Sequence, residues 1–109
     1  MTTSLRSAIA ELAADPAPAG RSARTIHGGR ESAFRQTLMV FVAGSGLAEH
    51  AAPGEATLLV LRGRVVVHAG DESVELDAGD LLDIPPHRHS VLAVTDAAIL
   101  LTIAAPARE

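Results

Sequence analysis

The strongest constraint on the fold is the regular succession of short alternating segments and turns between residues 46 and 90. Apolar and polar residues alternate there with a period of two, which is typical of β-strands that bury one face. Glycines fall at or near the turns, at positions 63, 70 and 79. Histidines stand at both ends of the stretch, His50 near its start and His87 and His89 near its close. This spacing predicts a small β-barrel that brings imidazoles from distant segments together at its mouth.

Further strand-like segments lie on both sides of this stretch. The sequence from residue 21 onward predicts roughly eight or nine short strands with frequent turn signals and no strong helix. The clearest segments are 22–26, 35–43, 57–61, 64–68, 73–76, 81–84, 89–94 and 98–104. This pattern indicates an all-β sandwich or a closed barrel made of two sheets.

The first twenty residues have a different character. Leu5, Ile9 and Leu12 recur at helical spacing after Ser4, which is a suitable N-cap, so the sequence predicts a short helix over residues 4–14. Prolines at 16 and 18 then end the helix and form a stiff linker. We therefore expect a helix and linker over residues 1–20 and one barrel domain over residues 21–109. The helix either lies on the surface or packs as an arm on a partner subunit.

Composition excludes several function classes. The chain of 109 residues has 13 acidic and 9 basic residues, all of the latter arginine, and a net charge of −4. The arginines are scattered and Tyr and Trp are absent, which argues against a nucleic-acid partner. No cysteine is present, so thiol chemistry is excluded. The longest apolar run, residues 97–105, is too short to span a bilayer, and no signal-peptide layout is seen, so we expect no membrane partner and a cytoplasmic protein.

Two motifs in the central stretch resemble those of the cupin superfamily of small β-barrels. The first cupin motif runs G-x5-H-x-H-x3,4-E-x6-G, and its closing glycine matches Gly63 while its first histidine matches His50. The second runs G-x5-P-x-G-x2-H-x3-N, and it matches Gly79 and Pro85, with His89 on the histidine position after a one-residue deletion. The resemblance covers about residues 35–104. It implies a single-domain double-stranded β-helix, or jelly-roll barrel, preceded by a short helix, and a branch of short cupins related to the RmlC-like proteins.

The metal-binding part of these motifs is incomplete. The resemblance implies iron, manganese, nickel or zinc held by three histidines and one glutamate. Alanine occupies the second histidine position (Ala52) and the glutamate position (Ala56). His50 and His89 would supply two ligands, and three protein ligands are the usual minimum for a catalytic zinc or non-haem iron site. The sequence therefore leaves open whether the protein binds a divalent metal as a cofactor.

Several residues are candidates for a third ligand or for other contacts at the mouth. Glu55 reaches the mouth only if a bulge shifts its register, and His87 only if its strand already begins there. Glu49 has the wrong strand parity, whereas Gln36 on a neighbouring strand is a neutral alternative partner for the histidines. Arg62 and Arg88 are candidates for binding an anion at the rim. They could instead form ion pairs with Glu55, Asp80 or Asp83. We expect His68 on an outer face and His27 at the surface or an interface.

These observations lead to two principal hypotheses of function. The first is a small cupin that binds an unidentified small molecule in the barrel mouth beside a degenerate metal site. The second is a metal-dependent enzyme of the dioxygenase or isomerase type that uses His50, His89 and a third ligand. A third possibility is a structural module whose barrel is simply packed. The apolar strands and the N-terminal segment also favour a homodimer.

Overall fold

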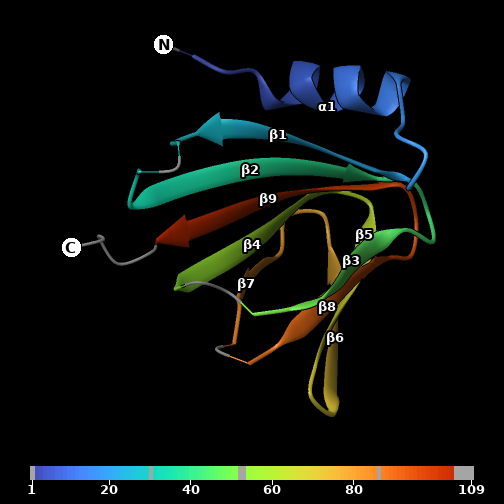
Figure 1. Ribbon diagram of the computed structural model, residues 1–109. Helices are drawn as coiled ribbons and strands as arrows, with labels where there is room; N and C mark the ends of the chain where they lie inside the picture. Colours follow the sequence, from blue (N-terminus) through green and yellow to red (C-terminus); the bar gives the residue numbers. More distant parts are fainter. Residues whose placement is uncertain (1, 30, 52–53, 86, 105–109) are drawn as a thin grey trace.

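The structure is a computed structural model that describes residues 2–29, 31–51, 54–85 and 87–104. In the described part of the chain, one helix, α1 (Leu5–Ala14), precedes nine strands. Figure 1 shows how these elements are arranged. The strands are β1 (Arg21–His27), β2 (Phe34–Phe41), β3 (Gly46–His50), β4 (Glu55–Arg62), β5 (Arg64–Ala69), β6 (Glu72–Asp77), β7 (Leu81–Asp83), β8 (His89–Ala93) and β9 (Ala97–Ala104). The predicted all-β fold with a short N-terminal helix is confirmed. Ala52, which occupies the second histidine position of the motif, lies outside the described residues.

Helix α1 begins and ends where the local sequence requires. The Ser4 side chain accepts a hydrogen bond from the Ser7 amide at 3.1 Å, which satisfies one of the free N–H groups of the first turn. The helix ends at Asp15 because a residue that precedes proline avoids the helical conformation. Ala8, the buried residue of the helix, faces the outer side of the sheet that contains β1 and β2. The predicted helix and its N-cap are therefore confirmed.

The strands form two antiparallel sheets. One has five strands in the order β1-β2-β9-β4-β7, and the other has four in the order β3-β8-β5-β6. Apart from β1–β2 and β5–β6, neighbouring strands in these sheets are not consecutive in the chain, and the two sheets curve around a common interior (Figure 1). This arrangement is the jelly roll that the sequence predicts.

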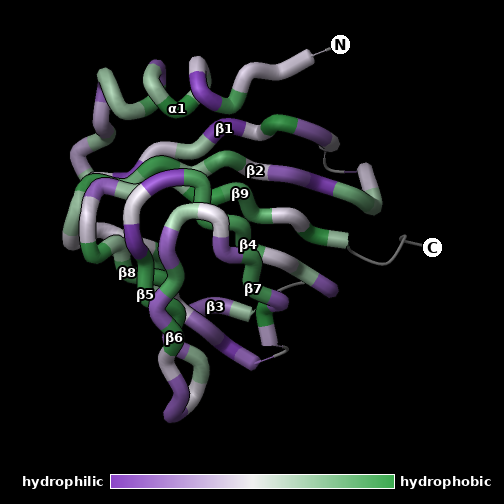
Figure 2. Tube along the Cα trace, turned by 180° about the vertical axis from the view of Figure 1, so that it is seen from behind, coloured by the Kyte–Doolittle hydropathy of each residue, from purple (hydrophilic) through white to green (hydrophobic). Residues whose placement is uncertain are grey.

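Alternation along the strands fills the interior. In β4, Ala56, Leu58 and Val60 are buried, whereas the residues between them are partly exposed. Complete burial of a Leu or Val side chain stabilises the fold by about 1.5–3 kcal/mol. The resulting cluster lies between the sheets and contains Phe41, Leu58, Val60, Val65, Val67, Leu76, Val91, Ala93, Ala97 and Ile99. The hydropathy colouring in Figure 2 shows apolar residues recurring along the strands of both sheets.

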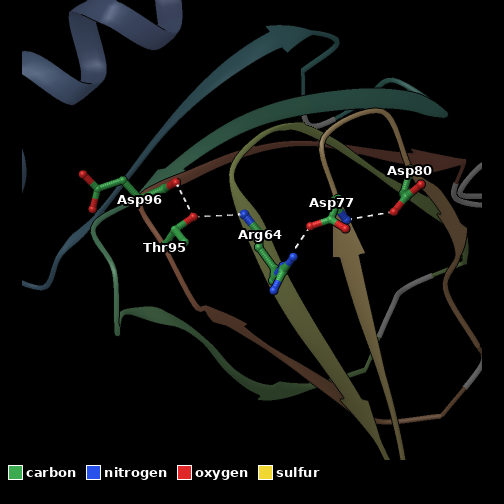
Figure 3. Close-up of polar contacts among 5 residues, drawn as sticks. All are labelled: Arg64, Asp77, Asp80, Thr95 and Asp96. Carbon is green, nitrogen blue, oxygen red and sulfur yellow. Dashed lines mark hydrogen bonds and ion pairs between the residues drawn. The ribbon is translucent and has the colours of Figure 1, made fainter.

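The two ends of the barrel differ. At one, which we call the turn end, short turns join β2 to β3, β4 to β5, β6 to β7 and β8 to β9. Polar contacts tie this end together (Figure 3): Arg64 donates to Asp77 at 2.8 Å, and the Arg64 amide donates to Thr95 at 3.0 Å. The hydrogen bond and the negative charge of Asp77 raise the pKa of Arg64. The segments after β1, β3 and β7 lie at the opposite end, which we call the loop end.

In the part of the chain that the structure describes, no helix combines the length and the apolar character needed to cross a membrane.

Candidate functional site

The loop end brings together two histidines that are far apart in the sequence. His50 ends β3 and His89 begins β8, and the two residues lie directly opposite each other in the β3–β8 ladder. Their ring centroids are 4.5 Å apart, with an angle of 56° between the ring planes. A register shift between Leu47 and His50 shows an irregularity of the bulge type in β3, a feature that re-aims side chains. The expected proximity of these imidazoles is therefore found.

The inner face of the barrel holds this histidine pair. His89 has the same strand parity as the core residues Val91 and Ala93, and only 2% of its surface is exposed. His50 is partly buried opposite it. Because burial of a polar ring is costly without hydrogen bonds, both rings need partners.

Each ring has the same kind of hydrogen-bond partner. The Nδ1 atom of His50 lies 2.8 Å from the carbonyl oxygen of Ala48, and that of His89 lies 3.2 Å from the carbonyl oxygen of His87. A carbonyl oxygen can only accept, so each Nδ1 atom must carry a proton and donate it. In the neutral rings, each Nε2 atom then keeps its lone pair. The pair therefore offers two Nε2 acceptors, which can bind a hydroxyl or amine hydrogen, or a metal ion.

The candidate third ligands do not join this pair. His87 is exposed, and its carbonyl group accepts the hydrogen bond from His89. Glu55 is exposed at the start of β4, and the adjacent Ala56 takes the buried position. Among the described residues, no three His, Cys, Asp or Glu side chains are grouped so that they could hold a metal ion. The donor set therefore differs from the three-histidine, one-glutamate set that the motifs imply.

Gln36 lies on the opposite face of its sheet from the core. It pairs with Thr102 of β9, and its side-chain amide donates to the Thr102 hydroxyl at 3.2 Å. The next residue, Thr37, pairs with Leu101, and Leu101 lies on the same face of β9 as the core residue Ile99. Thr37 therefore faces the core, and Gln36 faces the other side of the sheet. The interpretation that Gln36 contacts the histidines is therefore wrong, because strand parity turns its side chain to the outside.

The two candidate rim arginines are placed differently from each other. Arg88 donates to the exposed carboxylate of Glu49 at 3.0 Å and to the Glu49 carbonyl at 3.2 Å. The carboxylate partners that the sequence suggested for it, Glu55, Asp80 and Asp83, are not the ones it binds. Arg62 ends β4 at the turn end, away from the histidine pair. An anion beside the histidines must therefore find another cation.

Arg35 is a candidate functional residue that sequence reasoning missed. It has the same parity in β2 as the core-facing Met39 and Phe41, and it pairs with Ile103 at the loop end. Its side chain is partly buried, and its Nε atom is fully buried with no hydrogen-bond partner in the described part of the chain. The available signal was an arginine at an inward position of an apolar strand, where a packed core has an aliphatic residue.

The remaining histidines lie outside this site. His68 is exposed on the outer face of β5, as predicted. His27 is exposed at the end of β1, and its ring centroid lies 5.2 Å from that of Phe34. Two hollows found among the described residues are also elsewhere, between α1 and the five-stranded sheet, with volumes of about 60 and 420 Å³.

Comparison with known proteins agrees with this architecture. The model of the family described as "Cupin domain" matches residues 37–104. An RmlC-like cupin from Desulfovibrio desulfuricans is 31% identical, with a TM-score of 0.67, and the match covers 77% of this chain and 81% of the other. A protein of unknown function from Streptococcus pyogenes, SPY1581, has 20% identity and a TM-score of 0.75 over 86% of this chain and 82% of the other. A cupin superfamily protein from Desulfitobacterium hafniense has 20% identity and a TM-score of 0.72, over 79% and 78% of the two chains. The search of curated proteins gave no match.

Proposed function

Since the chain belongs to the cupin family, we propose that it binds a small polar molecule at the loop end of its barrel. The observation that carries this proposal is the histidine pair. The ring centroids of His50 and His89 lie 4.5 Å apart, and both Nδ1 atoms are hydrogen-bonded to backbone carbonyl groups. Their Nε2 atoms are the groups left to contact a ligand. In this account His50, His89 and Arg35 are binding residues.

The choice of residues at the loop end supports binding over simple packing. A structural barrel is stabilised by apolar side chains at inward positions, as the row formed by Val67 and Val91 illustrates. The next inward position of β8 instead holds His89, which is 2% exposed. An imidazole at this inward position costs desolvation free energy that an aliphatic side chain would not. A bound molecule that hydrogen-bonds to Nε2 offsets this cost.

The polar groups also indicate the chemistry of the ligand. The guanidinium of Arg35 offers N–H donors, which match a carboxylate, and one of them is buried without a partner among the described residues. The two Nε2 atoms accept hydrogen bonds, which match hydroxyl groups. A small hydroxycarboxylic acid carries both kinds of group. We therefore propose this class of ligand.

The metal-enzyme hypothesis fits the described residues less well. Two imidazoles are one ligand short of the usual minimum for a catalytic zinc or non-haem iron site, and neither His87 nor Glu55 converges on them. In the proposed function the histidine pair contacts the ligand directly, without a metal.

A binding screen tests the proposal. Hydroxycarboxylic acids, and amides of the same acids as controls, are screened against the full chain by thermal shift, and the hits are measured by calorimetry. We expect an acid to bind while its amide does not, and affinity to fall about tenfold or more in Arg35→Met, which corresponds to about 1.4 kcal/mol. The double variant His50→Ala/His89→Ala should lose binding as well.

His68→Ala is the matched control, because His68 is exposed on the outer face of β5. It should bind the acid as the wild type does. Circular dichroism confirms that each variant is folded. Failure of every acid to bind, or equal binding by the wild type and the histidine double variant, would contradict the proposed function.

A further inference from the structure

Helix α1 leaves a hollow beside the five-stranded sheet. The helix contacts β2 and β1 on the outer face of this sheet (Figure 1). Between the first half of the helix and the end of β4 lies a hollow of about 420 Å³. Pockets that bind small molecules have volumes of about 300–1,000 Å³, so this hollow is large enough to hold a small ligand.

The lining of the hollow is mostly apolar and carries two cations. It consists of Leu5, Arg6, Ile9, Ala10, Leu61 and Arg62. Leu5, Ile9 and Leu61 are only partly buried, so an occupant of the hollow would remove more of their apolar surface from water. Leu59 and Leu100 pair with each other on the same outer face and are also partly buried. The apolar surface therefore continues from the hollow along β4.

An irregularity in β4 places Arg62 beside the hollow. Val60 pairs with Ile99 and Arg62 pairs with Ala98, so one extra residue, Leu61, lies between these two pairs. Ala98 faces outward, since the adjacent Ile99 belongs to the inner core. Strict alternation after Val60 would turn Arg62 into the core, whereas the register shift keeps it on the outer face. A β-bulge re-aims side chains in this way and often lies next to a functional site.

The two arginines at the hollow are available to an anion. The ion pairs found among the described residues join Arg24 to Glu11, Arg64 to Asp77 and Arg88 to Glu49. Within the described ranges, Arg6 and Arg62 take part in none of them. Arg6 also lies in the first turn of α1, where a positive charge opposes the helix macrodipole, so helix stability does not account for this residue.

We propose that the hollow binds an unbranched fatty acid. The acyl chain lies against Leu5, Ile9 and Leu61, and the carboxylate accepts hydrogen bonds from the guanidinium groups of Arg6 and Arg62. A ligand with one acyl chain suits a volume near the lower end of the range for ligand pockets. None of these residues belongs to the histidine-pair site, so this inference does not rest on the proposed function.

Charge complementarity favours an anionic amphiphile over a cationic one. The whole chain has a net charge of −4, so its long-range field favours a cationic ligand. Only the local pair of Arg6 and Arg62 favours an anion at the hollow. A preference for the anionic head group is therefore a signature of this site and not of the overall charge of the protein.

Calorimetry with the full chain tests the proposal. The probe is decanoate below its micelle concentration, and decanol and decyltrimethylammonium carry the same alkyl chain with a neutral and a cationic head group. We expect decanoate to bind, and the other two to bind at least about tenfold more weakly. Octanoate should bind about tenfold more weakly than decanoate, because it buries two fewer methylene groups. Absence of decanoate binding, or equal affinity for decanoate and decyltrimethylammonium, would overturn the proposal.

Single arginine variants test the head-group contact. Arg6→Gln and Arg62→Gln should each weaken decanoate binding about fivefold or more, since each removes a charge-assisted hydrogen bond. The matched control is Arg88→Gln, which removes the same charge at the loop end, where Arg88 pairs with Glu49. It should bind decanoate as the wild type does, and circular dichroism checks that each variant is folded. Equal weakening in all three variants would refute the contact, because net charge alone would then govern binding.

Two further measurements locate the fatty acid and identify its source. On addition of decanoate, ¹H–¹⁵N NMR should show shifts of the amides in α1 and at the end of β4. Shifts confined to the loop end around His50 and His89 would refute this inference and leave the proposed function standing. In sedimentation with phosphatidylglycerol vesicles, we expect the protein to stay in the supernatant. Binding to the vesicles without binding to decanoate would identify a membrane surface as the occupant and overturn the proposal.

Discussion

Gly63 occupies a position in the turn between β4 and β5 that no other residue fits without strain. Its φ is +76°, and a Cβ atom built there would lie 2.1 Å from the Asp96 carbonyl oxygen and 2.7 Å from the Thr95 hydroxyl. Gly70, in the turn between β5 and β6, has a similar φ of +62° with no atom within 4 Å of its Cβ position. Comparison of the two alanine variants therefore separates backbone strain from steric collision.

The cost of each substitution follows from these values. Alanine in the left-handed region costs about 1–2 kcal/mol, which is the whole expected effect of Gly70→Ala. Gly63→Ala adds a collision with backbone, which forces the β8–β9 turn to move and typically costs about 1–3 kcal/mol more. It also disturbs the hydrogen bond that the Arg64 amide donates to the Thr95 hydroxyl and the one that the Val94 amide donates to the Arg64 carbonyl. We expect a total loss of about 2–5 kcal/mol.

Urea unfolding followed by circular dichroism measures both losses at one fixed protein concentration, since subunit association adds to apparent stability. For a domain of this size, 1 kcal/mol corresponds to about 4–8 °C in Tm, so thermal unfolding gives an independent check. Equal losses in Gly63→Ala and Gly70→Ala, within about 0.5 kcal/mol, would refute the reasoning that the Asp96 carbonyl excludes a side chain at position 63.

Other predictions concern the helix, the surface and the metal. Leu38→Ala should lower the free energy of unfolding by about 2–5 kcal/mol, because Leu38 is 0% exposed beneath α1, and a loss below 1 kcal/mol in urea would contradict the packing described. Arg88→Ala should cost less than about 1 kcal/mol, since its ion pair with Glu49 is exposed, and a larger loss would show that this contact is structural. Protein incubated with Zn²⁺, Fe²⁺, Mn²⁺ or Ni²⁺ and then dialysed should retain substoichiometric metal by plasma mass spectrometry. Stoichiometric metal that disappears in His50→Ala/His89→Ala would support the metal-enzyme hypothesis instead.

Local patterns predicted the elements of the fold because their physical causes are local. Ser4 caps the helix through its own neighbour, and the alternation in β4 and β5 reflects burial of every second side chain. The proximity of His50 and His89 was also predictable, since the motif spacing carries information on which strands pair. In the structure the two residues are direct partners in the β3–β8 ladder.

Which residues face the site could not be predicted from local patterns, because this depends on how strands distant in sequence pair. Whether Gln36 or Arg35 faces the interior depends on which residues of β9 they pair with, and a shift of one residue exchanges the two faces. The sequence suggested Gln36 as an alternative partner of the histidines, whereas the register turns Arg35 inward. The hollow between α1 and β4 was likewise beyond prediction, because it depends on where the helix docks across the sheet.

The central claim is that the histidine pair presents two Nε2 atoms at the loop end of the barrel. Long-range ¹H–¹⁵N NMR of the metal-free protein in alkaline buffer, where imidazole is neutral, tests this claim directly. His50→Ala and His89→Ala assign the signals. The account predicts that both rings carry their proton on Nδ1, as the carbonyl groups of Ala48 and His87 require, and that Nε2 bears none. A neutral ring with its proton on Nε2 in either residue would contradict it.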